Sequence, residues 1–155
     1  MQSFIFAAIN SHTKRKLFRM KRILSVSYSS AAFNLSMFLL RVGFGLLLII
    51  QHGLPKLQNF SAMQSQFYNF MGLGTQVSLA LVIFAELICG FFILLGLFTR
   101  LAVIPLIITM LVVIFGRNAG KPLVDSEMAI MYLCTFIFLL FCGPGRISVD
   151  GMINR

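Results

Sequence analysis

Two ionisable residues of opposite charge interrupt stretches of this sequence that are otherwise apolar. Arg41 lies in L-R-V-G-F-G-L-L-L-I-I, and Glu86 is the only acidic residue in the interior of an apolar stretch. A guanidinium or a carboxylate in such surroundings is costly unless it has a partner. We therefore predict that Arg41 and Glu86 form a buried polar pair.

Counting along the chain places both members of this pair at a similar depth. At about 1.5 Å per helical residue, Arg41 lies about 12 Å beyond Phe33 and Glu86 about 15 Å beyond Gln76. Three interpretations follow. The pair neutralises itself and fixes helix register, or it lines a pocket that holds a headgroup or relays protons. Alternatively, Arg41 extends towards the cytoplasmic interface and leaves Glu86 protonated. The sequence is compatible with all three.

The composition identifies the elements that must position these residues. The chain has 155 residues, of which 59% are hydrophobic, and its mean hydropathy is +0.94. A soluble domain is about half apolar and about a quarter charged. Since a bilayer core needs about 20 residues per helix, the length allows about four spans and leaves no room for a separate catalytic domain. We predict an all-α integral membrane four-helix bundle.

The apolar stretches give the boundaries of the predicted bundle. We expect Pro55 to end or kink the first span. Between the first two spans, S-A-M-Q-S-Q-F-Y-N-F-M-G predicts a short helix lying in the membrane interface. The predicted spans cover residues 33–53, 76–98, 100–116 and 126–142, within a domain over 33–143 that precedes a cytoplasmic tail over 144–155.

Basic residues are distributed unevenly along the chain. The formal net charge is +9, and six of the thirteen lysines and arginines lie between Lys14 and Arg22. We interpret residues 1–32 as a basic cytoplasmic extension that contacts anionic lipid headgroups, which argues against nucleic-acid binding. If the N-terminus is cytoplasmic, nine lysines and arginines face that side and three face the other. Both termini are therefore predicted in the cytoplasm. The bundle is predicted in the bacterial plasma membrane. Met20 is an alternative start to Met1.

A second polar group is predicted near the outer end of the first span. His52 follows Arg41 by eleven residues, so both lie on one helix face about 16 Å apart. Lys56 comes next in the chain, and Glu127 opens the fourth span on the same side of the membrane. Together they predict a mouth that binds a quinone carbonyl or an anion. The alternative is a solvated rim.

A third group gathers on the cytoplasmic side. Arg100 follows the short turn between the second and third spans, and Arg146 and Asp150 lie in the tail. We favour a structural clasp over a binding site for these three residues.

Several kinds of site have no support in the sequence. Cys89, Cys134 and Cys142 lie in apolar stretches without a C-x-x-C motif, so we interpret them as core residues. His52 is the only histidine available inside the bundle, which argues against a haem held by two histidines. Phosphate-loop, zinc and nucleophile motifs are missing. We expect no metal site and no tightly bound cofactor, and no catalytic residue is assigned.

Short motifs in the right order resemble the DoxX family of small four-helix bacterial membrane proteins over about residues 39–150. They are L-R-V-G-F-G, H-G-L-P-K-L, E-L-I-C-G-F-F-I-L-L-G-L-F-T-R and G-P-G-R-I-S-V-D. The resemblance implies a plasma-membrane protein linked in some members to quinone-coupled oxidation, since the related DoxD protein is a subunit of thiosulfate:quinone oxidoreductase. Other members are associated with oxidative-stress or thiol-redox systems. The matching positions are Arg41, His52, Gly53, Lys56, Glu86, Gly96, Arg100, Gly143, Gly145, Arg146 and Asp150.

These observations lead to one leading hypothesis and one rival. The first is an accessory subunit of a quinone-linked or thiol and oxidative-stress redox system, which binds a quinone-like molecule around Arg41, His52 and Glu86. Because the sequence carries no motif for an electron carrier, this subunit needs a redox partner protein or a diffusing quinone. It could be a non-catalytic subunit of a membrane oxidoreductase, or a homo-oligomer in the bilayer. The rival is a non-catalytic permease or scaffold in which the Arg/Glu pair is purely structural.

Overall fold

The computed structural model describes residues 29–153, which contain helices and no strand. The chain divides into two units, residues 1–32 and residues 33–155. The predicted basic extension lies almost entirely outside the described residues, as do both candidate start positions. The bundle belongs to the second unit, which is described here by itself.

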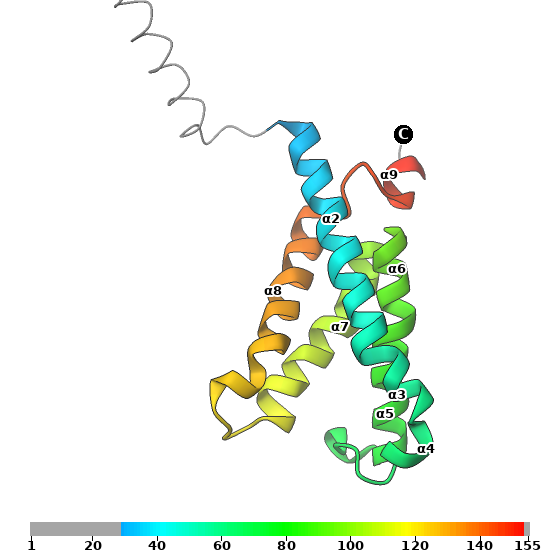
Figure 1. Ribbon diagram of the computed structural model, residues 1–155, viewed down its shortest axis with the longest axis vertical. Helices are drawn as coiled ribbons and strands as arrows, with labels where there is room; N and C mark the ends of the chain where they lie inside the picture. Colours follow the sequence, from blue (N-terminus) through cyan, green and yellow to red (C-terminus); the bar gives the residue numbers. More distant parts are fainter. Residues whose placement is uncertain (1–28, 154–155) are drawn as a thin grey trace, which may run out of the picture. The chain divides into compact units, whose positions relative to one another are not determined.

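Four helical segments are long and apolar enough to cross a membrane: Ser30–Gln58, Thr75–Leu95, Thr99–Arg117 and Leu123–Cys142. Figure 1 shows the segments lying side by side, each running in the opposite direction to the one before it. The predicted all-α class with four candidate membrane spans is confirmed. The cytoplasmic location of both termini stays a prediction.

Each span consists of more than one helical element. The first contains α2 (Ser30–Leu48), η1 (Ile49–Gly53) and α3 (Leu54–Gln58), and the second contains α5 (Thr75–Ile83), η3 (Phe84–Cys89) and α6 (Gly90–Leu95). The third contains α7 (Thr99–Val112) and η4 (Val113–Arg117), and the fourth contains η5 (Leu123–Ser126) and α8 (Glu127–Cys142). The elements η1, η3 and η4 are π-helical. Outside the spans lie α4 (Phe60–Met63), η2 (Phe70–Gly72) and α9 (Val149–Ile153).

The first span continues beyond its predicted end. Pro55 follows the π-helical segment η1 directly, and such a local change of the hydrogen-bond pattern lets a membrane helix continue through a proline. The expected interfacial helix is replaced by the short elements α4 and η2. Around η2, side chains bond the backbone instead: the Phe70 N–H donates to Ser78 Oγ (3.0 Å) and the Gly74 N–H to Asn69 Oδ1 (2.8 Å). Such local bonds compete with helix formation.

Glycines set the register between the first two spans. A Cβ added to Gly45 would lie 3.5 Å from Leu94, and one added to Gly53 would lie 2.8 Å from Leu87 Cγ. Small residues at such positions let membrane helices approach closely. Continued along both helices, this register places Lys56 beside η3 and Arg41 beside the turn after α6.

The buried core lies between the spans, with α7 and α8 packed closely against each other. Its fully buried apolar side chains include Leu48, Ile93, Val103, Leu106, Phe136 and Leu139. This core holds the four spans in the positions that form the sites below.

Candidate functional site

Lys56 and Glu86 form a buried ion pair at the end of the bundle where the first span finishes. Lys56 Nζ lies 2.5 Å from each oxygen of the Glu86 carboxylate. Glu86 is only 3% exposed. Because each charge satisfies the other, the pair offsets much of the cost of placing charge between membrane helices.

This ion pair borders a cavity of about 340 Å³, which we call the polar cavity. Its charged lining residues come from all four spans and the loop that follows the third. Three of them are cationic and two are acidic, so the lining carries an excess of positive charge. The charged residues are Lys56, Glu86, Arg117, Lys121 and Asp125.

All three π-helical segments of the bundle contribute to the polar cavity. His52 comes from η1, Glu86 from η3 and Arg117 from η4. A π-helical turn is rare and occurs frequently at functional sites, because it changes the direction of side chains within an otherwise regular helix. Three spans therefore depart from α-helical geometry around the same cavity. The α8 residues that line it, Met128, Ala129 and Tyr132, belong to a regular helix.

His52 and Tyr132 face each other across the polar cavity lining. Their ring centroids lie 5.6 Å apart in an edge-to-face arrangement, and Tyr132 also packs edge-on against Phe44 at 5.6 Å. Tyr132 is 4% exposed. His52 Nε2 is buried and has no hydrogen-bond partner among the described residues. A buried polar atom without a partner calls for a physical explanation, such as a bound ligand or water.

The predicted Arg41–Glu86 pair is wrong. Arg41 Nη1 donates to the Ile93 carbonyl oxygen (3.3 Å), and Nη2 donates to the Ile147 carbonyl oxygen. The depth count started from Phe33 and Gln76 and assumed that both helices begin at matching depths, but the packing places Gly53 beside Glu86 and Leu87. Arg41 precedes Gly53 by twelve residues, about 18 Å along the helix axis, which is too far for a contact with Glu86.

Arg41 instead stabilises the end of the second span. The last carbonyl groups of a helix lack partners within the helix, and a cation is favourable there because of the helix dipole. Helical side chains also tilt towards the N-terminus of their own helix, which directs Arg41 towards this end. Gly96 provides the space: it has a φ of 71°, and a Cβ there would lie 2.1 Å from Arg41 Nη1.

Asp150 plays the complementary role at the start of the third span. Its carboxylate oxygens accept hydrogen bonds from the N–H groups of Phe98 (2.9 Å) and Thr99 (3.0 Å), and its own N–H donates to the Gly96 carbonyl oxygen (2.9 Å). An anion is favourable at a helix N-terminus. We use the name clasp for Arg41, Gly96, Ile147 and Asp150, which join the first span, the turn and the tail.

The predicted cytoplasmic cluster of Arg100, Arg146 and Asp150 is therefore rearranged. Asp150 bonds backbone N–H groups and not an arginine side chain in these contacts. Arg146 takes part through its backbone N–H, which donates to Asn34 Oδ1 (2.7 Å). Arg100 lies beside Gly143, where a Cβ would be 3.7 Å from its guanidinium. The arginine in the clasp is Arg41, which the sequence assigned to a different partner.

The predicted mouth residues do not all come together. His52 and Lys56 line the polar cavity, but Glu127 is exposed on α8 and does not. Asp125 takes the acidic position, because the 3-10 turn η5 starts the fourth span earlier than predicted. Tyr132 was not predicted as a cavity residue, although it is the only tyrosine inside a predicted span, which was a usable signal.

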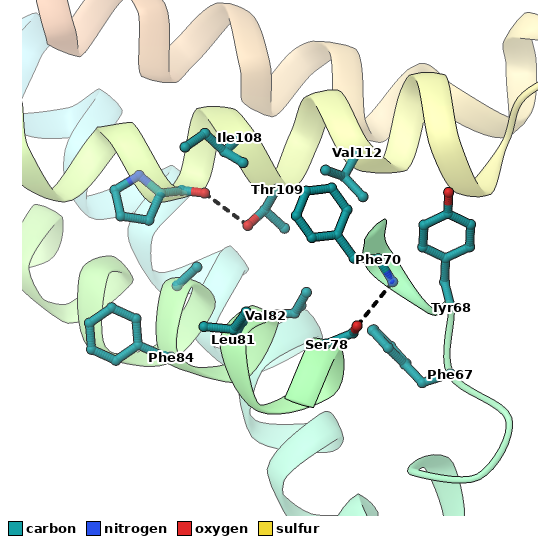
Figure 2. Close-up of a pocket in the computed structure, with 12 residues that line it drawn as sticks. Phe67, Tyr68, Phe70, Ser78, Leu81, Val82, Phe84, Ile108, Thr109 and Val112 are labelled. Atoms are coloured by element: carbon teal, nitrogen blue, oxygen red, sulfur yellow. Dashed lines mark hydrogen bonds between the residues drawn. The ribbon is translucent and has the colours of Figure 1, made fainter. Parts of the chain in front are cut away.

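A separate apolar groove of about 300 Å³ lies between the second and third spans (Figure 2). Phe67, Tyr68 and Phe70 border one end of it. The hydroxyl groups of Ser78 and Thr109 donate to the carbonyl oxygens of Gly74 (2.7 Å) and Pro105 (2.9 Å). Since these hydroxyls are bonded within the protein, the groove suits hydrocarbon, and the chemistry of a polar ligand belongs to the polar cavity. Within the described residues, no group of His, Cys, Asp and Glu could hold a metal ion.

Comparison with known proteins agrees with this architecture. The family model for DoxX matches residues 36–118. The chain belongs to the DoxX family. The DoxX match contains Arg41, His52, Lys56 and Glu86, and ends before Lys121.

A relative of this DoxX protein, an uncharacterized membrane protein of Mycobacterium tuberculosis, is 33% identical over 84 residues. The match covers 45% of this chain and 52% of the relative, so the chain spans about half the length of that protein. No solved structure matches the chain.

Proposed function

We propose that this DoxX protein is an accessory subunit of a quinone-linked or thiol and oxidative-stress redox system in the bacterial plasma membrane. Its role is to bind a quinone-like molecule in the polar cavity. The observation that carries the proposal is the convergence of three π-helical segments on this cavity, which place His52, Glu86 and Arg117 around one space.

The cavity lining fits a ring that bears carbonyl groups. Lys56 and Tyr132 carry hydrogen-bond donors, and the imidazole of His52 can donate or accept according to its tautomer. The buried His52 Nε2 has no partner among the described residues, so a ligand oxygen or hydroxyl there would satisfy it. Met110, Val113 and Ala129 supply an apolar part of the lining for the ring itself.

A quinone takes up protons when it is reduced, and the Lys56–Glu86 pair is suited to hold them. Lys56 Nζ carries protons within 2.5 Å of the Glu86 carboxylate, next to the cavity. The excess of positive charge around the cavity favours a ligand that gains negative charge. Electrons would reach the ligand from a redox partner protein, so the subunit needs no electron carrier of its own.

Ligand binding in lipid nanodiscs tests this proposal. A short-chain ubiquinone analogue and a menaquinone analogue are titrated into the purified protein, and bound quinone is measured after rapid separation. We expect saturable binding that Glu86→Gln weakens by about tenfold or more, the effect of losing one charged hydrogen bond. Glu127→Gln is the matched control, because this exposed acid does not line the cavity.

Two results would overturn the proposal. One is that neither quinone binds the folded wild-type protein at any soluble concentration, which would favour a permease or scaffold. The other is that Glu127→Gln weakens binding as much as Glu86→Gln does, which would show an effect of general charge and not of the polar cavity.

A further inference from the structure

A third cavity lies at the opposite end of α7 from the polar cavity. It has a volume of about 550 Å³ and separates the first turn of α7 from the chain that follows α8. We call it the tail-end cavity. Residues that line it include Phe98, Thr99, Arg100, Leu101, Cys142 and Gly143.

Arg100 provides a charge that the protein itself leaves available. Its side chain makes no hydrogen bond or ion pair with another residue of the described range 29–153. The guanidinium lies next to Gly143, where a Cβ would be in ordinary contact, 3.7 Å from Nε and Nη2. The guanidinium therefore sits at the cavity wall with its donors free for an external anion, and arginine is well suited to bind phosphate oxygens.

The carboxylate of the neighbouring acidic residue is bonded to the backbone. Asp150 also lines the tail-end cavity, but its carboxylate oxygens accept the N–H groups of Phe98 and Thr99 at the start of α7. Thr99 is fully buried, and its hydroxyl oxygen has no hydrogen-bond partner among the described residues. Because Thr99 has no exposed surface, the polar group that the cavity offers to a ligand is the Arg100 guanidinium.

The other part of the lining is apolar and faces outward. Phe98 is 62% exposed and Leu101 is 68% exposed. Both residues lie at the boundary of a candidate membrane span, which begins at Thr99. A cation beside exposed apolar side chains at this depth matches the two parts of an anionic lipid, and basic pockets between membrane helices bind such headgroups.

We propose that the tail-end cavity binds an anionic phospholipid, with its phosphate on Arg100 and its acyl chains against Phe98 and Leu101. This site is independent of ligand binding in the polar cavity. Its ligand comes from the membrane leaflet that contacts the tail.

Lipid retention tests this proposal with a matched pair of variants. The protein is reconstituted in mixed phosphatidylglycerol and phosphatidylcholine, extracted in mild detergent, and its retained lipids are identified by native mass spectrometry. We expect a preference of about fivefold for phosphatidylglycerol, the factor that one such charge supplies, and its loss in Arg100→Gln. Arg146→Gln removes the same charge at the same end of the bundle, outside the cavity lining, and should keep the preference.

Two outcomes of this experiment would overturn the proposal. Equal loss of preference in Arg100→Gln and Arg146→Gln would show attraction to the general surface charge. An unchanged preference in Arg100→Gln would show that the lipid binds elsewhere.

Protection of Cys142 gives a readout that does not depend on the folding of the Arg100 variant. In a protein carrying Cys89→Ala and Cys134→Ala, Cys142 is the only thiol, and it lines the tail-end cavity. Phosphatidylglycerol should slow its alkylation by a small uncharged maleimide about fivefold compared with phosphatidylcholine alone. No slowing would contradict the proposal. Equal slowing by inorganic phosphate in phosphatidylcholine would identify a free anion as the ligand and overturn the lipid assignment.

Discussion

The first span carries two cations that have different surroundings. Arg41 is 1% exposed and donates to backbone carbonyl groups, in a region where Gly96 leaves just enough space for it. Lys56 bonds the carboxylate of Glu86 and borders a cavity of about 340 Å³. Arg41 caps carbonyl groups at the end of the second span, whereas Lys56 borders a cavity that a further molecule can enter.

This difference shows what a buried charge in a membrane protein does and does not indicate. An ionisable residue at membrane depth is a functional candidate by default, and the sequence favoured Arg41 at that depth over Lys56 in the outer mouth. The surroundings separate them, because a charge needs neighbouring space to act on a ligand. Four substitutions test the distinction between the clasp and the polar cavity.

Replacing Lys56 should have the largest effect. Lys56→Met leaves the Glu86 carboxylate buried without a partner, which should lower the free energy of unfolding by about 4 kcal/mol. Adding Glu86→Leu should recover most of this stability but not ligand binding. Reversible unfolding in mixed micelles measures the stability. If the double variant is less stable than Lys56→Met alone, the pairing is refuted.

Replacing Arg41 should also destabilise the protein, for another reason. Arg41→Met removes the charged donors to Ile93 and Ile147 and should cost about 3 kcal/mol. Adding Glu86→Leu should not compensate, so the two losses should add. The folded fraction of Arg41→Met should bind quinone like the wild type. If the Arg41→Met, Glu86→Leu double variant is more stable than Arg41→Met alone, Arg41 and Glu86 are direct partners and the contacts described for Arg41 are wrong.

Gly96→Ala should have an intermediate effect. The new methyl group would lie 2.1 Å from Arg41 Nη1 and 2.5 Å from Ser148 Cβ, at a backbone φ of 71°. We expect a loss of about 2 kcal/mol from backbone strain and displacement of the guanidinium. Gly120→Ala is a control for the backbone effect, because Gly120 also has a positive φ but no atom lies within 4 Å of its Cβ position. Equal losses of stability in Gly96→Ala and Gly120→Ala would show that close packing at Gly96 has no effect beyond that of the backbone conformation.

Asp150→Asn should have the smallest effect of the four. An asparagine side chain has one acceptor oxygen, so it can still bond one of the two N–H groups that Asp150 now accepts at the start of α7. The expected loss is about 1 kcal/mol, the usual scale for a helix N-cap. Thermal unfolding in detergent measures it, with Asp150→Ala expected to lose more. A larger loss in Asp150→Asn than in Arg41→Met would reverse the order proposed for the clasp.

Hydropathy alone predicted the helical class and the four candidate spans, because long apolar runs have few other solutions. The partners of Arg41 and Glu86 depended on helix register, and register came from close contacts at Gly45 and Gly53 that a single sequence does not reveal. The first span also runs five residues beyond its predicted end, so Lys56 lies inside it and pairs with Glu86. The π-helical segments have no simple sequence signature, so the convergence on the polar cavity was also not predictable.

The clasp has a consequence for the order in which the protein is made. Arg41 belongs to the first span, but one of its acceptors is the carbonyl group of Ile147, and Asp150 bonds the Phe98 N–H after the adjoining turn. The first three spans can enter the membrane while these tail residues are still unsynthesised. During that time the Arg41 guanidinium lacks the Ile147 carbonyl group as an acceptor. Biogenesis should therefore pass through a stage in which the spans are inserted but loosely joined, and translation of Ile147–Asp150 completes the assembly.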